Sequence, residues 1–132
     1  MSSINEKQLQ ETFVWSRSTF HSEYNGYLAQ YKVESCFENI RGNSLLDLAC
    51  GDGMMTEMFA QKVSHVVGVD ANGNHLAEAR KRLPSVEFHE CLVEELQLNE
   101  KFDTVTMLDL LEHVVDPIAL LQKAASFLND DG

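Results

Sequence analysis

Four short apolar runs are interspersed with three stretches that have helical spacing, and this alternation constrains the fold more than any other feature of the chain. The predicted strands cover Ser44–Leu48, His65–Val69, Val86–Phe88 and Phe102–Leu108. Apolar residues then recur every three or four positions, as on one face of a helix. The three sets are Met55, Met58, Phe59 and Val63; Leu76, Ala79 and Leu83; and Ile118, Leu121, Ala125 and Leu128. Strand alternating with helix predicts an α/β fold with a doubly wound, mainly parallel sheet.

The first predicted strand leads directly into a turn with two glycines, in the segment Leu45-Leu46-Asp47-Leu48-Ala49-Cys50-Gly51-Asp52-Gly53. Gly51 and Gly53 let the backbone turn tightly beneath a ligand, and the next helix directs its free N–H groups at that ligand. A carboxylate at Asp47 repels a dinucleotide pyrophosphate and attracts a positively charged ligand. Thr56 also stands where a dinucleotide fingerprint has its third glycine, which disfavours a nicotinamide-dependent oxidoreductase.

A second acidic residue, Asp70, ends the second predicted strand, 17 positions after Gly53 (70 minus 53). In doubly wound folds, a carboxylate at this strand tip accepts the hydrogen bonds of a ribose diol. An Asp that only caps the following helix is the alternative. The strand, the glycine turn and the second acid together predict a nucleoside-containing cofactor.

The LDLACGDG segment resembles motif I of the class I S-adenosylmethionine-dependent methyltransferases, with Ala49 in place of the first glycine of LDLGCGxG. The resemblance implies a Rossmann-like sheet, S-adenosylmethionine as cofactor and S-adenosylhomocysteine as product. Many members carry an Asp where this chain has Leu92, so the chain departs from the family pattern at the position that binds the adenine. The cofactor-binding residues that it implies are Asp47, Ala49, Cys50, Gly51, Gly53, Asp70, Ala71, Leu92, Val93 and Asp109.

The segment Met107–Pro117 is similar to the LEHVPDP signature of methyltransferases that act on small metabolites, including the ubiquinone O-methyltransferases. The spacing of Asp109, Glu112 and His113 resembles the metal-binding ExxEH of small-RNA 2′-O-methyltransferases and of some ubiquinone methyltransferases, in which a divalent ion polarises the acceptor hydroxyls. His113 has instead the ordinary pKa range of a general base. Glu112 and His113 also fit a purely structural role in the loop. We take His113 and Asp109 as the catalytic candidates, and we assign no metal ligands.

The resemblance divides the chain into an N-terminal helical segment, residues 1–42, and an incomplete cofactor-binding domain, residues 43–132. Aromatic and histidine side chains of the first segment either pack in the core or close over the cofactor and substrate. They are Trp15, His21, Tyr24 and Tyr27. The family's sheet has seven strands, of which we expect only the first four here. Thr104–Leu108 would then form an open sheet edge, suited to a homodimer, and we expect the 132-residue chain alone to be inactive.

A formal net charge of −11 disfavours nucleic-acid partners. The basic run Arg80-Lys81-Arg82 fits a helix C-terminus better than a phosphate site. The chain has no long apolar span and no signal-peptide pattern, and its three cysteines have no metal-type spacing, so we expect a cytoplasmic protein with reduced thiols and no membrane partner. The function that the sequence predicts is methyl transfer to an O or N atom of a small metabolite. A non-catalytic module that binds S-adenosylmethionine, as a sensor or scaffold, is the alternative.

Overall fold

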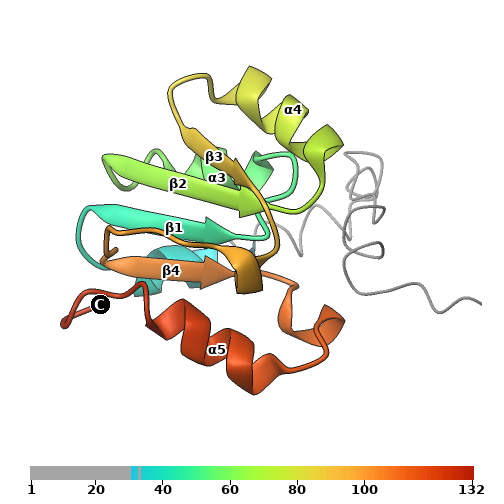
Figure 1. Cartoon of the computed structure of the whole chain (residues 1–132). Coiled ribbons are helices and arrows are strands. Elements are labelled where there is room, and N and C mark those ends of the chain that lie inside the picture. Colours follow the sequence, from blue (N-terminus) through green and yellow to red (C-terminus); the bar gives the residue numbers. More distant parts are fainter. Residues whose placement is uncertain (1–30, 33) are drawn as a thin grey trace, which may run out of the picture.

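A computed structural model of the chain describes residues 31, 32 and 34–132, and it contains a four-stranded parallel sheet flanked by helices (Figure 1). The strands stand in the order β3-β2-β1-β4, so the chain winds outward from β1 in both directions. This is the predicted doubly wound α/β fold. The strands are β1 (Ser44–Leu48), β2 (His65–Asp70), β3 (Glu87–Glu90) and β4 (Thr104–Met107).

Three α-helices and two 3-10 turns connect and follow these strands. The α-helices are α3 (Met54–Phe59), α4 (Gly73–Arg82) and α5 (Pro117–Ala125), and the 3-10 turns are η2 (Val93–Glu95) and η3 (Leu111–His113). Residues 34–39 are also helical. All four strand arrows point the same way in Figure 1, so the loops that follow the strands gather at one edge of the sheet.

Alternate residues of the central strands pack on opposite faces of the sheet. Leu46 and Leu48 of β1 face a core that includes Leu120 and Phe127, so α5 covers this face. Leu45 points to the other face, where it packs in a cluster with Phe59 of α3. Partly buried side chains of the helix at residues 34–39 and of the residue that follows it complete this second cluster; they are Cys36, Phe37 and Ile40. Helices on both faces explain why the strands are apolar almost throughout.

The boundaries of two predicted strands shift in the structure. The third strand was expected at Val86–Phe88 but runs from Glu87 to Glu90, because its backbone pairs with β2 as far as Asp70. The fourth was expected at Phe102–Leu108 but runs only from Thr104 to Met107. Phe102 is fully buried and forms an isolated bridge with Leu128 instead.

The predicted inward face of the last helix is wrong. Ile118 and Leu121 are 68% and 45% exposed, Ala125 is exposed, and the buried side chains are those of Leu120, Ala124 and Phe127. Both sets have helical spacing, so periodicity does not choose between them, and the angle at which α5 meets the sheet decides. Met58 of α3, also expected in the core, is 40% exposed.

Local sequence signals mark the helix ends. The Asp116 carboxylate accepts the backbone N–H of Ala119 at the start of α5, where Pro117 follows it. The basic run ends α4 as expected, and the Arg82 side chain donates to the backbone carbonyl of Asp52. Gly42, which ends the N-terminal helical pattern, has a φ of +65°.

The predictions for Trp15, His21, Tyr24 and Tyr27 lie outside the described residues. Within the part of the chain that the structure describes, no helix is long and apolar enough to cross a membrane. All three cysteines, Cys36, Cys50 and Cys91, are free.

Candidate functional site

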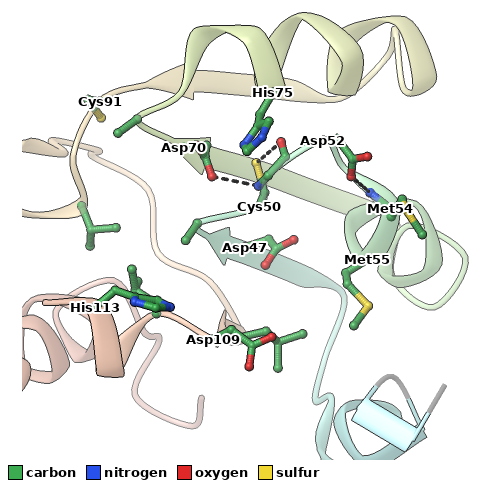
Figure 2. A pocket seen from close by; sticks show the side chains of 16 residues that line it. Asp47, Cys50, Asp52, Met54, Met55, Asp70, His75, Cys91, Asp109 and His113 are labelled. Carbon is green, nitrogen blue, oxygen red and sulfur yellow. Dashed lines mark hydrogen bonds between the residues drawn. The ribbon is translucent and has the colours of Figure 1, made fainter. Parts of the chain in front are cut away.

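A cavity of about 400 Å³ lies at the carboxyl edge of the sheet, where β1, β2 and β4 end (Figure 2). Its position is that of ligand sites in open α/β sheets. Most of the residues predicted from the sequence line it. They are Asp47, Ala49, Cys50, Gly51, Asp70, Ala71, Val93, Asp109 and His113.

Two predicted residues, Gly53 and Leu92, are not among the lining residues. A Cβ atom at Gly53 would stand 3.1 Å from the Cβ of Ala79, so the close approach of the turn to α4 and a φ of +81° both favour glycine there. A Cβ atom at Gly51 would meet nothing within 4 Å. Gly51 therefore presents open backbone beside the cavity, and Gly53 packs the turn against a helix.

The turn after β1 has a left-handed backbone at three positions. Gly51 and Gly53 have φ of +58° and +81°, and Ala49 has a φ of +59°. Glycine adopts this region without strain, whereas alanine rarely does. Ala49 occupies the position at which the motif ordinarily has glycine, so this chain keeps the geometry of the turn with a less suitable residue.

Asp47 is a buried carboxylate between two strands and a helix, with only 2% of its surface exposed. It accepts hydrogen bonds from the Oγ1 hydroxyls of Thr56 (2.7 Å) and Thr106 (2.8 Å). Burial raises its pKa to about 6, against the lowering by the two hydroxyls. The carboxylate is therefore mostly ionised at neutral pH, and a cation in the cavity would favour its charged form.

Asp70 lies at the tip of β2, as predicted, with both carboxylate oxygens hydrogen-bonded. Oδ2 accepts the backbone N–H of Gly51 at 2.9 Å, and Oδ1 accepts that of Asn72 at 2.8 Å. The alternative role, capping of the next helix, belongs to Asn72, whose side chain accepts from the first turn of α4. Because a carboxylate has about four acceptor positions, Asp70 keeps capacity for a ligand. Burial raises its pKa, and the backbone hydrogen bonds oppose that rise.

Asp109 follows β4 with a φ of +54° and lines the cavity from the opposite side. Its Oδ2 lies 2.5 Å from the Nζ of Lys32, which comes from the N-terminal helical segment. Sequence reasoning did not anticipate this pair. The two residues are 77 positions apart, and no local pattern marks Lys32.

His113 lines the cavity from η3, whereas Glu112 does not. The His113 Nε2 and the Glu112 Oε1 are 3.9 Å apart. Among the described residues, no three His, Cys, Asp or Glu side chains gather as they would around a metal ion. Asp109, Glu112 and His113 are therefore near one another along the chain but do not form a cluster.

The remaining lining residues were not among the predicted site residues, although Cys91 adjoins the segment at which we expect the adenine. Met54 and Met55 begin α3, and Leu108 and Leu110 flank Asp109. Cys91 lies near Val93 on the side where we expect the adenine. Asp52 lies within the glycine turn, and His75 lies beside it. His75 could not be distinguished in the sequence from an ordinary helical residue.

The fold and this cavity define a class of protein, the Rossmann-like methyltransferases, and comparisons with known proteins agree. The family described as "Methyltransferase domain" matches residues 20–132. The ubiquinone biosynthesis O-methyltransferase of Haemophilus ducreyi is 35% identical over 110 residues, which cover 76% of this chain and 47% of that protein. The chain belongs to the class I S-adenosylmethionine-dependent methyltransferase family.

Solved structures show the same fold. An S-adenosylmethionine-dependent methyltransferase from Clostridium acetobutylicum has a TM-score of 0.69 at 26% identity, covering 85% of this chain and 49% of that one. An N-methyltransferase from Bradyrhizobium japonicum, in complex with S-adenosylhomocysteine, has a TM-score of 0.78 at 12% identity over 93% of this chain and 66% of that one. The chain spans less than half the length of the curated relatives that it matches.

Proposed function

We propose that the chain is the cofactor-binding part of an S-adenosylmethionine-dependent methyltransferase that methylates an O or N atom of a small metabolite. The observation that carries the proposal is the position of Asp70, beside the open backbone of Gly51 and at the tip of β2. This is where a ribose diol meets a carboxylate in doubly wound folds. The two backbone hydrogen bonds hold the carboxylate in place before a ligand arrives.

The charge of the cavity also fits this cofactor. Its lining includes four carboxylates, those of Asp47, Asp52, Asp70 and Asp109. Such a cavity disfavours the pyrophosphate of a dinucleotide and favours a ligand with an ammonium or a sulfonium group. Lys32 donates a hydrogen bond to Asp109 and so places a positive charge near that part of the cavity. This charge would neutralise a carboxylate of the ligand.

S-adenosylmethionine supplies a methyl group on a sulfonium, which is an excellent leaving group. The work of the protein is then to align the reacting atoms and to exclude water. The apolar side chains of Met54, Met55, Leu108 and Leu110 line the cavity and limit the entry of water. Where the acceptor must lose a proton, His113 is the side chain that we propose to receive it, because it lines the cavity and histidine is the side chain that most often serves as a general base.

The acceptor is a proposal from the relatives and the charge. Similarity to the ubiquinone biosynthesis O-methyltransferases supports an oxygen atom of a small molecule as the methyl acceptor. The net charge of −11 makes a nucleic-acid acceptor unfavourable. Because the chain spans less than half the length of these relatives, we expect no turnover by these 132 residues alone.

Calorimetry with S-adenosylmethionine, S-adenosylhomocysteine and NAD tests the cofactor. We expect binding of the first two and none of NAD. Asp70→Ala should weaken S-adenosylhomocysteine binding by about 1.5–3 kcal/mol, through loss of hydrogen bonds to a charged acceptor. Asp130→Ala removes an exposed carboxylate outside the cavity lining and serves as the control.

Equal affinity of wild type and Asp70→Ala would remove the ribose assignment. Binding of S-adenosylmethionine without methylation by a chain extended to the length of its relatives would instead favour the non-catalytic sensor or scaffold.

A further inference from the structure

His75 is a buried polar side chain whose ring nitrogen Nε2 has no hydrogen-bond partner among the residues that the structure describes. The residue is 9% exposed and lines the cavity. Its situation differs from that of the other buried polar residues. The hydroxyls of Thr56 and Thr106 each donate a hydrogen bond to Asp47, and the Asn72 side chain caps α4. Since native proteins rarely leave a buried polar atom unpaired, the Nε2 of His75 calls for a functional explanation.

The first turn of α4 determines where the imidazole lies. The backbone N–H of His75 donates to the Asn72 Oδ1 at 3.3 Å, which anchors the residue at the start of the helix. From there the ring projects toward Cys50 and Asp70, beside the glycine turn (Figure 2). Burial raises the pKa of the Asp70 carboxyl; the backbone hydrogen bonds from Asn72 and Gly51 oppose that rise, and the nearby His75 opposes it to a smaller extent. The His75 imidazole and the Asp70 carboxylate therefore line the same part of the cavity.

We propose that His75 is a cofactor-binding residue that hydrogen-bonds the ribose, so that it shares recognition of the diol with Asp70. The inference rests on the proposed function, because it takes the ligand of this cavity to be an S-adenosyl compound. An ionised carboxylate only accepts hydrogen bonds, whereas each ribose hydroxyl can both donate and accept. In the tautomer that carries its proton on Nε2, the imidazole donates to a hydroxyl oxygen whose own proton is directed at Asp70.

This arrangement satisfies all the groups concerned. Each oxygen of Asp70 already accepts one backbone N–H and takes a ribose O–H at a remaining position. The ribose oxygen gains a donor, and the Nε2 of His75 gains a partner. The ligand class that fits is a nucleoside with a free diol, and a nucleoside that lacks one hydroxyl leaves a buried group unpaired.

The test combines variants of His75 with analogues of S-adenosylhomocysteine that lack the 2′- or the 3′-hydroxyl. His75→Leu has a similar volume and no polar atom, and His75→Gln keeps an N–H donor. We expect His75→Leu to weaken S-adenosylhomocysteine binding about 5- to 10-fold and His75→Gln to weaken it less. Both deoxy analogues should bind wild type more weakly than the parent compound, because each lacks a hydrogen bond to Asp70. The loss should be larger for the analogue that also lacks the contact with His75, and this excess should shrink in His75→Leu, because both changes remove the same contact.

Thermal unfolding without ligand separates this role from a structural one. If the Nε2 is unpaired in the ligand-free protein, its replacement by an apolar side chain should leave the midpoint equal or higher. Three outcomes would overturn the proposal: unchanged affinity in His75→Leu, equal losses for both analogues in wild type and variant, or a lowered midpoint in both His75 variants with unchanged relative affinities. Failure of wild type to bind S-adenosylhomocysteine would instead reject the proposed function.

Discussion

The Nζ of Lys32 lies 2.5 Å from the Oδ2 of Asp109, and this ion pair joins the N-terminal helical segment to the end of β4. The side chains of Lys32 and Asp109 are 35% and 33% exposed, so water screens their attraction. The pair therefore contributes more to the placement of the Asp109 carboxylate beside the cavity than to the stability of the fold.

A double-mutant cycle with Lys32→Met and Asp109→Asn tests this view. Asparagine tolerates the left-handed backbone at position 109, so the substitution changes charge with little added strain. We expect a coupling free energy below about 1 kcal/mol in urea unfolding. A coupling of several kcal/mol would show instead that the pair is a main support of the fold.

Asp47 should make the protein less stable as the pH rises. Its folded pKa of about 6 lies above its ordinary value of 3.8, because burial penalises the charged form. Because the pKa of Asp47 is higher in the folded than in the unfolded state, its contribution to the free energy of unfolding is complete below the unfolded pKa. That contribution is lost as the pH rises through the folded pKa. The total effect is on the order of 3 kcal/mol, at 1.36 kcal/mol per pKa unit.

Urea unfolding of wild type and Asp47→Asn between about pH 4 and about pH 7 measures this effect, because the other carboxyl groups cancel in the difference. We expect the free energy of unfolding of Asp47→Asn, relative to that of wild type, to increase as the pH rises. A difference that does not vary with pH would contradict the raised pKa.

Leu120 and Leu121 form a matched pair for testing the face on which α5 packs. Leu120 is fully buried, whereas Leu121 is 45% exposed. Leu120→Ala should lower the free energy of unfolding by about 2–5 kcal/mol through a cavity in the core. Leu121→Ala should cost less than about 1 kcal/mol. The reverse order would place the predicted face, rather than the observed one, against the sheet.

Among the described residues, one edge of β4 has no strand partner, and this edge predicts self-association of the chain. Within the described sheet, β4 pairs only with β1. A hollow of about 420 Å³ lies beside β4, lined by the strand and by residues of the N-terminal helical segment. An exposed strand edge is a template for pairing with another chain, and we propose a second copy of this one.

Light scattering over a range of concentrations should show a dimer, and the amides of Thr104–Met107 should exchange hydrogen more slowly as the concentration rises. Ile118→Lys serves as the control, because Ile118 is 68% exposed on a different element, α5. A dimer that dissociates in Ile118→Lys would place the interface on α5, and a monomer at all concentrations would reject self-association.

Local patterns determined the architecture of the described residues. The five residues of β1, the glycine turn and the caps at Asp116 and Gly42 are all recognisable within short windows, because each depends on neighbouring residues alone. The glycine-turn motif pointed to Asp47, and the position at the end of the second strand pointed to Asp70. Both line one cavity, since the carboxyl ends of parallel strands meet at the same edge.

Tertiary structure decided what depends on contacts between distant segments. Two apolar faces of α5 have equally good helical spacing, and only packing against the sheet selects Leu120 over Leu121. The pairing of Lys32 with Asp109 and the burial of His75 leave no local trace, because each arises where separate elements meet in space. The sequence by itself thus determined the order of the elements and the type of cavity, whereas three-dimensional packing determined which side chains complete it.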